Sequence, residues 1–260
     1  ILKDVDLSGK DLSDSILKDV DLSGKDLSGT NLAYSDLRLS DLSGTILSDS
    51  ILLRANLSKI DLRTTKLDNA DFRYANLTES KLPDSLLVNN NFDHATLKNI
   101  NFAGKDLSGS SFQRAELDGS DMRNTNLSDA AFVQVDFTKI KNKSLAGADL
   151  SYTSLAHSNL SGVDLSEASL VATNFWKADL SGLDFTVISD ASTEGSTFIE
   201  SNLSNSNFEG VDLSPKEQLS SVFKNKAYLM RGITQTLEAE AKIRKELFTE
   251  FNHILILSIE

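Results

Sequence analysis

The sequence contains no cysteine and only two prolines among its 260 residues. The missing cysteines exclude disulfide cross-links, thiol catalysis and Cys-based zinc or iron–sulfur sites. No apolar run is longer than the four residues Ile254–Leu257, whereas a membrane-spanning helix needs about 20. Because 40% of the residues are nevertheless apolar, the composition predicts a folded chain with a hydrophobic core, not a disordered or collagen-like one.

The apolar residues follow a period of five. A Leu, Phe or Met occupies every fifth position from Leu2 through Phe137, again from Leu145 through Phe185, and then at 198, 203, 208 and 213, which makes 41 units. Extra residues near 138–143 and 186–197 interrupt the period. Five fits neither the helical period of 3.6 nor the strand period of 2. We therefore expect a solenoid in which the chain turns a corner in each unit and directs one central residue inward per side.

Each unit has further regular positions around its central residue. A small residue stands two before it, Asp or Asn often directly before it, and Gly often two after it, where a turn is expected. Lys10, Lys25 and Lys105 break the rule at the small position. We expect their stems to lie along the core and their ammonium groups to reach solvent at a corner, with a locally widened coil as the alternative.

The spacing of phenylalanines indicates how many sides a coil has. Phe72, Phe92, Phe112 and Phe132 are each 20 residues apart, which predicts an aromatic stack on one side of a four-sided coil. If the extra segments bulge at corners, Phe175 and Phe198 join the same stack. Residues 1–13 recur identically at 16–28, a shift of 15 that would suit three sides. We interpret that shift as a duplication in multiples of five.

Several of the five-residue units share a sequence pattern that resembles a known family. They include Ala55-Asn56-Leu57, Ala70-Asp71-Phe72, Ala75-Asn76-Leu77 and Ala178-Asp179-Leu180. Such A(D/N)LXX units resemble the pentapeptide repeat family, and the resemblance covers about residues 1–213. It implies an all-β solenoid, a right-handed four-sided parallel β-helix. With about 4.8 Å between neighbouring strands, roughly ten to eleven coils would give one domain about 50 Å long.

The last 47 residues, 214–260, lack the period and are expected to be mainly helical. Ser214 followed by Pro215 and by Glu217 is a capping box that predicts a helix start. Leu219, Val222 and Phe223 share one face of that helix, which would cap the open end of the solenoid. A second amphipathic helix is expected over about 235–251, and its apolar face is formed by Ile233, Leu237, Leu247, Phe248 and Phe251.

Three roles remain open for this C-terminal segment. It can fold back on its own solenoid as a cap. It can form a homodimer, as the resemblance implies, because gyrase-binding members of the family dimerise through their C-terminal ends. The β-prone run 254–259 can also lead into a further segment, such as a membrane anchor. The chain begins at Ile1 in mid-pattern, so export or a preceding segment also stays open, although we favour the cytoplasm.

No catalytic, cofactor or metal site is predicted. Only three histidines occur, and His94, His157 and His253 lie in outward, corner or tail positions, where each is expected to be a solitary surface side chain. The phosphate-binding glycine motifs and the HExxH and GxSxG motifs are absent from the sequence. We therefore expect a protein that is not an enzyme.

The net charge of −12 belongs to the repeats. Residues 1–213 hold 32 acidic and 19 basic residues, a net charge of −13, and 16 of those acids are the Asp that precedes a central residue. This balance argues against direct binding of nucleic acid. We expect a rigid acidic rod that binds an unknown protein partner. The alternative implied by the resemblance is a DNA-mimicking regulator of DNA gyrase, a type II topoisomerase, although duplex DNA carries roughly 30 charges per 50 Å.

Overall fold

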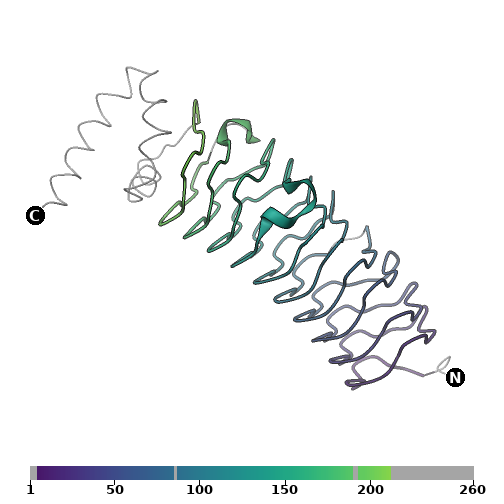
Figure 1. Ribbon diagram of the computed structural model, residues 1–260. Helices are drawn as coiled ribbons and strands as arrows, with labels where there is room; N and C mark the ends of the chain where they lie inside the picture. The colour runs from purple at the N-terminus through teal and green to yellow at the C-terminus, as the bar shows by residue number, and fades with distance from the viewer. Residues whose placement is uncertain (1–4, 85–86, 190–192, 212–260) are drawn as a thin grey trace, which may run out of the picture.

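The computed structural model describes residues 5–84, 87–189 and 193–211. These residues wind into coils that stack along one axis as an elongated rod (Figure 1). Isolated parallel bridges join residues that are 20 apart, such as Asp11 with Asn31 and Ile16 with Asp36. Four five-residue units therefore make one coil, and each unit forms one side. The β-solenoid predicted from the period is confirmed, and Asp11 pairs 20 residues onward, not 15.

Each corner is a tight turn that begins at a central residue. The N–H of Lys10 donates to the carbonyl of Leu7, for example, and Gly9 between them has a φ of +62°. A positive φ at the third residue is typical of a type II turn. Since the N–H of Gly9 also donates to the carbonyl of Ser28 in the next coil, each corner is fastened to its neighbour.

Both interruptions of the period are absorbed at corners. The first contains two 3₁₀ helices, η1 (Phe137–Lys139) and η2 (Lys141–Lys143), and the second contains η3 (Phe185–Val187). The side chains of Asp136 and Asp184 accept hydrogen bonds from the second residues of η1 and η3. Across each interruption the bridges join residues 23 apart instead of 20. The coils therefore continue in register after three extra residues.

One five-residue unit was not recognised from the sequence, because its central residue is not Leu, Phe or Met. Thr193 is fully buried and occupies a central position between the second interruption and Phe198. Gly195 stands two residues after it with a φ of +70°, as in other units. The interruption is thus shorter than the segment 186–197, and the sequence rule failed because Thr was not accepted as a central residue. The turn glycine was the signal that could have found it.

The rod's core is built from the central residues. Phe72, Phe92, Phe112 and Phe132 form one continuous stack, whose ring centroids are 5.1, 5.0 and 4.5 Å apart in chain order. Leu155, which is fully buried, takes the next place in that row. Phe175 and Phe198 then stack at 5.2 Å. The two aromatic groups lie on one side of the rod, separated by one leucine.

Polar side chains at the small inward position satisfy carbonyl groups of the core. Thr30 donates through Oγ1 to the carbonyl of Leu7 in the preceding coil at 2.8 Å, and Thr65 donates likewise to Leu42 at 3.0 Å. These bonds compensate for burial of the hydroxyl groups. The small position is therefore also a position for bonds between coils.

Lys105 differs from the expectation that its ammonium reaches solvent. Its side chain is only 9% exposed, and Nζ donates to the carbonyl of Pro83 at 2.8 Å and to Asp84 at 2.7 Å. The ammonium group therefore binds the preceding coil, as the shorter hydroxyl groups do elsewhere. Lys25 reaches the carbonyl of Val5 at 3.4 Å, and Lys10 is exposed.

Candidate interaction surface

No catalytic residue is predicted from the sequence, and two of the three histidines, His94 and His157, lie along one edge of the rod. The His94 ring stacks on Tyr74 with centroids 4.5 Å apart, and the His157 ring meets Trp176 edge-on at 4.8 Å. Within the described part of the chain, no group of three or more His, Asp or Glu side chains could hold a metal ion. In the same residues, no helix is long and apolar enough to cross a membrane.

The residues predicted to cap or to dimerise lie outside the described residues. They are Ser214, Glu217, Leu219, Val222 and Phe223, together with Ile233, Leu237, Leu247, Phe248 and Phe251. The same holds for His253. The site is therefore built from the rod's sides.

Much of the rod's acidity has a structural role. The Asp or Asn before a central residue accepts a hydrogen bond from the N–H two residues later, as Asp6 does from Ser8 at 3.0 Å and Asp26 from Ser28 at 2.9 Å. In Asp6, hydrogen bonds from the Ser8 hydroxyl and N–H lower the carboxyl pKa. These carboxylates are thus committed to turns, in agreement with the repeat's preference for Asp or Asn.

Four arginines are neutralised locally by the same carboxylates. Each stands two residues after an Asp, and its guanidinium donates to both carboxylate oxygens, from Nε to Oδ1 at 2.8–3.0 Å and from Nη2 to Oδ2 at 2.6–2.7 Å. The pairs are Arg38 with Asp36, Arg63 with Asp61, Arg73 with Asp71 and Arg123 with Asp121. These four cations therefore contribute little net positive charge to the surface.

We expect these carboxylates to make the rod sensitive to acid. Hydrogen bonds from Arg38 and Arg63 lower the pKa of Asp36 and of Asp61 to about 2, whereas an unfolded Asp titrates near 3.9. Because the folded pKa is the lower one, the stabilisation is present above pH of about 4 and is lost as the pH falls toward 2. Circular dichroism melts should show a constant Tm above pH 5 and a falling Tm between pH 4 and 2. A Tm unchanged down to pH 2 would contradict this role.

A row of large side chains follows one corner of the rod, and we call it the edge row. It contains one residue per coil, two positions after a central residue: Tyr34, Arg54, Tyr74, His94, Arg114, Gln134, His157 and Lys177. The side with the phenylalanine stack ends at this corner. Eight coils in succession thus present an aromatic, cationic or neutral polar side chain, and no carboxylate.

The edge row is ordered by contacts between its own side chains. The Arg54 guanidinium lies 5.8 Å from the Tyr34 ring centroid and 5.1 Å from that of Tyr74, so the cation is held between two rings. His94 continues the stack beyond Tyr74. Cation–π contacts of this kind contribute about 0.5–1 kcal/mol each at exposed sites. The rings stack along the rod axis, one coil above the next.

The backbone at the edge row is unusual for such large residues. All eight have a φ between +55° and +60°, for example +60° at Tyr34 and +56° at Arg54. Each of the other three corners contains several glycines in the same turn position, such as Gly24, Gly109 and Gly162. The left-handed backbone conformation is energetically unfavourable for residues other than Gly, Asn and Asp. The fold itself therefore does not explain why large side chains occupy this corner in eight successive coils, between Asp14 and Glu200 at the same turn position.

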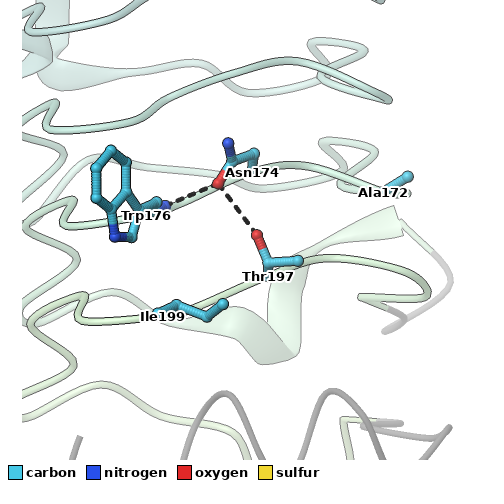
Figure 2. Close-up of a pocket in the computed structure, with 5 residues that line it drawn as sticks. All are labelled: Ala172, Asn174, Trp176, Thr197 and Ile199. Carbon is cyan, nitrogen blue, oxygen red and sulfur yellow. Dashed lines mark hydrogen bonds between the residues drawn. The ribbon is translucent and has the colours of Figure 1, made fainter. Parts of the chain in front are cut away.

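A small open hollow lies near the C-terminal end of the same side. It is lined by Ala172, Asn174, Trp176, Thr197 and Ile199 (Figure 2). The Asn174 side-chain oxygen accepts from the backbone N–H of Trp176 at 3.0 Å and from the Thr197 hydroxyl at 3.1 Å, which holds the Asn174 side chain in place. Trp176 is 40% exposed and Ile199 is 42% exposed. Its exposed side chains, Trp176 and Ile199, are therefore mainly apolar.

The edge row was not identified from the sequence. The same 20-residue spacing that relates the phenylalanines also relates Tyr34, Arg54, Tyr74, His94 and Arg114. The turn position was interpreted only as a place for glycine. Reading the 20-residue spacing at that position would have found the row.

Comparisons with known proteins follow the repeat. The sequence profile of pentapeptide repeats matches eight stretches, which together cover most of 2–214: 2–32, 11–49, 26–63, 50–87, 91–129, 100–138, 148–186 and 183–214. A search of curated proteins finds no match. Among solved structures, HetL, a pentapeptide repeat protein involved in heterocyst differentiation regulation from the cyanobacterium Nostoc sp. strain PCC 7120, is 23% identical, with 76% of this chain and 91% of HetL covered and a TM-score of 0.34.

Two further structures are similar. QnrB1, a plasmid-mediated fluoroquinolone resistance protein, is 17% identical in a trypsin-treated form, with 73% of this chain and 83% of QnrB1 covered and a TM-score of 0.40. Rfr23 from the cyanobacterium Cyanothece 51142 is 33% identical over 41% of this chain and 63% of its own, with a TM-score of 0.14. These TM-scores are low, so the fold rests on the bridges between coils and on the repeat. Because the matched repeats span most of the sequence, the chain belongs to the pentapeptide repeat family.

Proposed function

We propose that this protein is a non-enzymatic interaction module, a rigid rod that presents its sides to a protein partner. The observation that carries the proposal is the edge row, where large side chains stand at positive φ although the turn needs only a glycine. Strained positions that the fold does not require are typical of functional surfaces. The row is also continuous over eight coils, which suits an extended contact.

Site-specific photo-crosslinking would test this proposal. A benzophenone amino acid at position 34 or 74 should give a discrete protein adduct in extract of the source organism. The matched control carries the same group at Ser43, an exposed residue on another side of the rod. Adducts that are equally abundant from both sides, or from neither, would contradict a partner-specific side.

DNA mimicry is the second candidate. It is favoured by the outward Asp side chains of the N-terminal coils, such as Asp6, Asp21, Asp26 and Asp41, which have no arginine two residues later. The net charge of −13 over residues 1–213 is less than half of the roughly 30 charges on 50 Å of duplex DNA, so the edge-row function is preferred. Dose-dependent inhibition or protection of gyrase supercoiling would support mimicry, and no effect at micromolar protein would contradict it.

We also propose that residues 1–213 and 214–260 form two parts, the rod and a mainly helical segment that caps its end and joins two copies. Deleting 233–260 should leave the β signal in circular dichroism intact and lower the molecular mass measured by light scattering. Loss of the β signal would show instead that this segment is part of the rod's core. An unchanged mass per particle, apart from the deleted residues, would contradict dimerisation through it.

A further inference from the structure

We propose that the edge row binds an extended acidic segment of a partner protein, with two carboxylates of that segment on Arg54 and Arg114. This inference rests on the proposed function and names the chemistry of the partner. Three observations support it: which arginines of the rod are paired with carboxylates, how the guanidinium groups of Arg54 and Arg114 are held in place, and how the distance between these two arginines matches the spacing of side chains in an extended peptide.

The first observation is which arginines are neutralised. The described residues contain six arginines, and four of them are bound to the Asp two residues earlier. Arg54 and Arg114 are the two in this part of the chain that form no ion pair. Both are exposed and both lie in the edge row. In a rod with excess carboxylates, two guanidinium groups are thus left for an external anion.

Two carboxylates on the side that ends at the edge row already have partners. On the side that ends at the edge row, Asp71 is bound to Arg73 at 2.6 Å. Asp93 accepts hydrogen bonds from the Ser111 hydroxyl at 2.5 Å and from the Gln113 N–H at 2.8 Å. These bonds hold both carboxylates in place. They therefore do not take the role of a partner carboxylate at Arg54.

The second observation is that both guanidinium groups are held in place before binding. Arg54 lies between the rings of Tyr34 and Tyr74. Arg114 donates from Nε to the side-chain oxygen of Gln134 at 2.5 Å, in the next coil. A guanidinium has five N–H donors, so the outer edge of Arg114 remains available for a carboxylate. An ordered arginine loses less conformational entropy on binding, which favours affinity.

The third observation is the distance between the two sites. Arg54 and Arg114 are 60 residues apart, which is three coils of 20. At about 4.8 Å per coil, their places in the row are about 14 Å apart. An extended peptide advances about 3.4 Å per residue, so four residues span about 14 Å, and side chains four apart point to the same face. Acidic residues at i and i+4 of an extended segment therefore match both arginines.

Other ligand shapes match less well. A helix needs about nine residues to cover 14 Å, and side chains nine apart lie on opposite faces of a helix. A nucleic acid carries a charge on every nucleotide, and the net charge of −13 on residues 1–213 would repel it outside the edge row. A short peptide with two carboxylates meets the guanidinium groups of Arg54 and Arg114 and adds little repulsion elsewhere.

The test is fluorescence anisotropy with the full chain and labelled eight-residue peptides rich in Thr and Val. Peptide A has Glu at positions 2 and 6, peptide B has Glu at 2 and 5, and peptide C has Gln at 2 and 6. We expect A to bind about tenfold more tightly than B or C. Arg54→Gln and Arg114→Gln should each weaken the binding of A about tenfold, a difference of about 1.4 kcal/mol. Arg63→Gln, on another side and bound to Asp61, should leave it unchanged.

The outcomes separate this inference from the proposed function. Equal binding of peptides A, B and C would overturn the inference. Absence of binding of peptide A to the chain without substitutions, when that chain has a normal circular dichroism spectrum, would overturn it as well. If the benzophenone adducts at positions 34 and 74 were still found, the proposed function would stand with a partner of other chemistry. A single-stranded oligonucleotide that binds more tightly than A and loses binding in Arg54→Gln would overturn it in favour of nucleic acid.

Discussion

Replacing Phe112 with Ala is expected to lower the free energy of unfolding by about 3–5 kcal/mol, the range for removing a buried phenylalanine. Phe112 is fully buried between Phe92 and Phe132, at 5.0 and 4.5 Å, and meets Phe102 edge-on at 6.3 Å. The cavity would remove the stacking contacts on both neighbouring coils. Since a coil is stabilised only by its neighbours, one substitution weakens two interfaces. Urea unfolding followed by circular dichroism measures the loss.

Phe112→Leu is the matched control. Leu155 occupies the corresponding place in the same row of the core, fully buried, so the rod accommodates a leucine there. We expect this variant to lose distinctly less stability than Phe112→Ala. Two variants of equal stability, or an alanine variant within about 1 kcal/mol of the parent, would show that the aromatic stack is not a principal source of stability.

Replacing Gly147 with Val should have the next largest effect, about 2–3 kcal/mol of lost stability. Gly147 has a φ of +69°, and a left-handed conformation costs other residues roughly 1–2 kcal/mol, most for β-branched ones. An added Cβ would also displace the side-chain oxygen of Asn124 in the preceding coil, which adds a smaller cost because that side chain can rotate away. Thermal and urea unfolding measure the loss.

The two causes can be separated with Asn124. In an Asn124→Ala background the collision is removed and only the backbone strain remains, so Gly147→Val should then cost less. Gly147→Asn is a second comparison, because Asn124 itself adopts a φ of +55° one coil earlier. A Gly147→Val variant as stable as the parent would contradict both causes together.

The repeat made the rod predictable because the period places each residue type. Leu, Phe and Met at every fifth position can only face inward, and the 20-residue spacing from Phe72 to Phe92 indicates the length of a coil. Thr193 was missed because a threonine is smaller than the usual central residue, although the structure buries it fully. The binding partner of the Lys105 ammonium group was also not predicted, because its hydrogen bond to the Pro83 carbonyl depends on how the preceding coil turns.

The edge row was less predictable because the repeat does not constrain it. An outward turn position accepts any side chain that tolerates positive φ, so its residues appear unrelated when read in chain order. Their relation appears only when residues 20 apart are compared, as with Tyr34 and Arg54. That Arg54 is without a carboxylate while Arg73 has one follows from the residue two positions earlier, which is Leu52 in one case and Asp71 in the other.

The corners after Phe137 and Phe185 show how a rod of this kind can acquire loops. Both follow the same local sequence, Asp-Phe-Thr, a variable residue and Ile, at 136–140 and 184–188. Each turns into a short 3₁₀ segment, and the bridges then resume with a constant offset. The sequence separation of the paired residues grows only by the number of inserted residues. The sides of the coils after the insertion therefore stay aligned with the sides of the coils before it. Length can therefore vary at such corners while the surface before and after them stays intact.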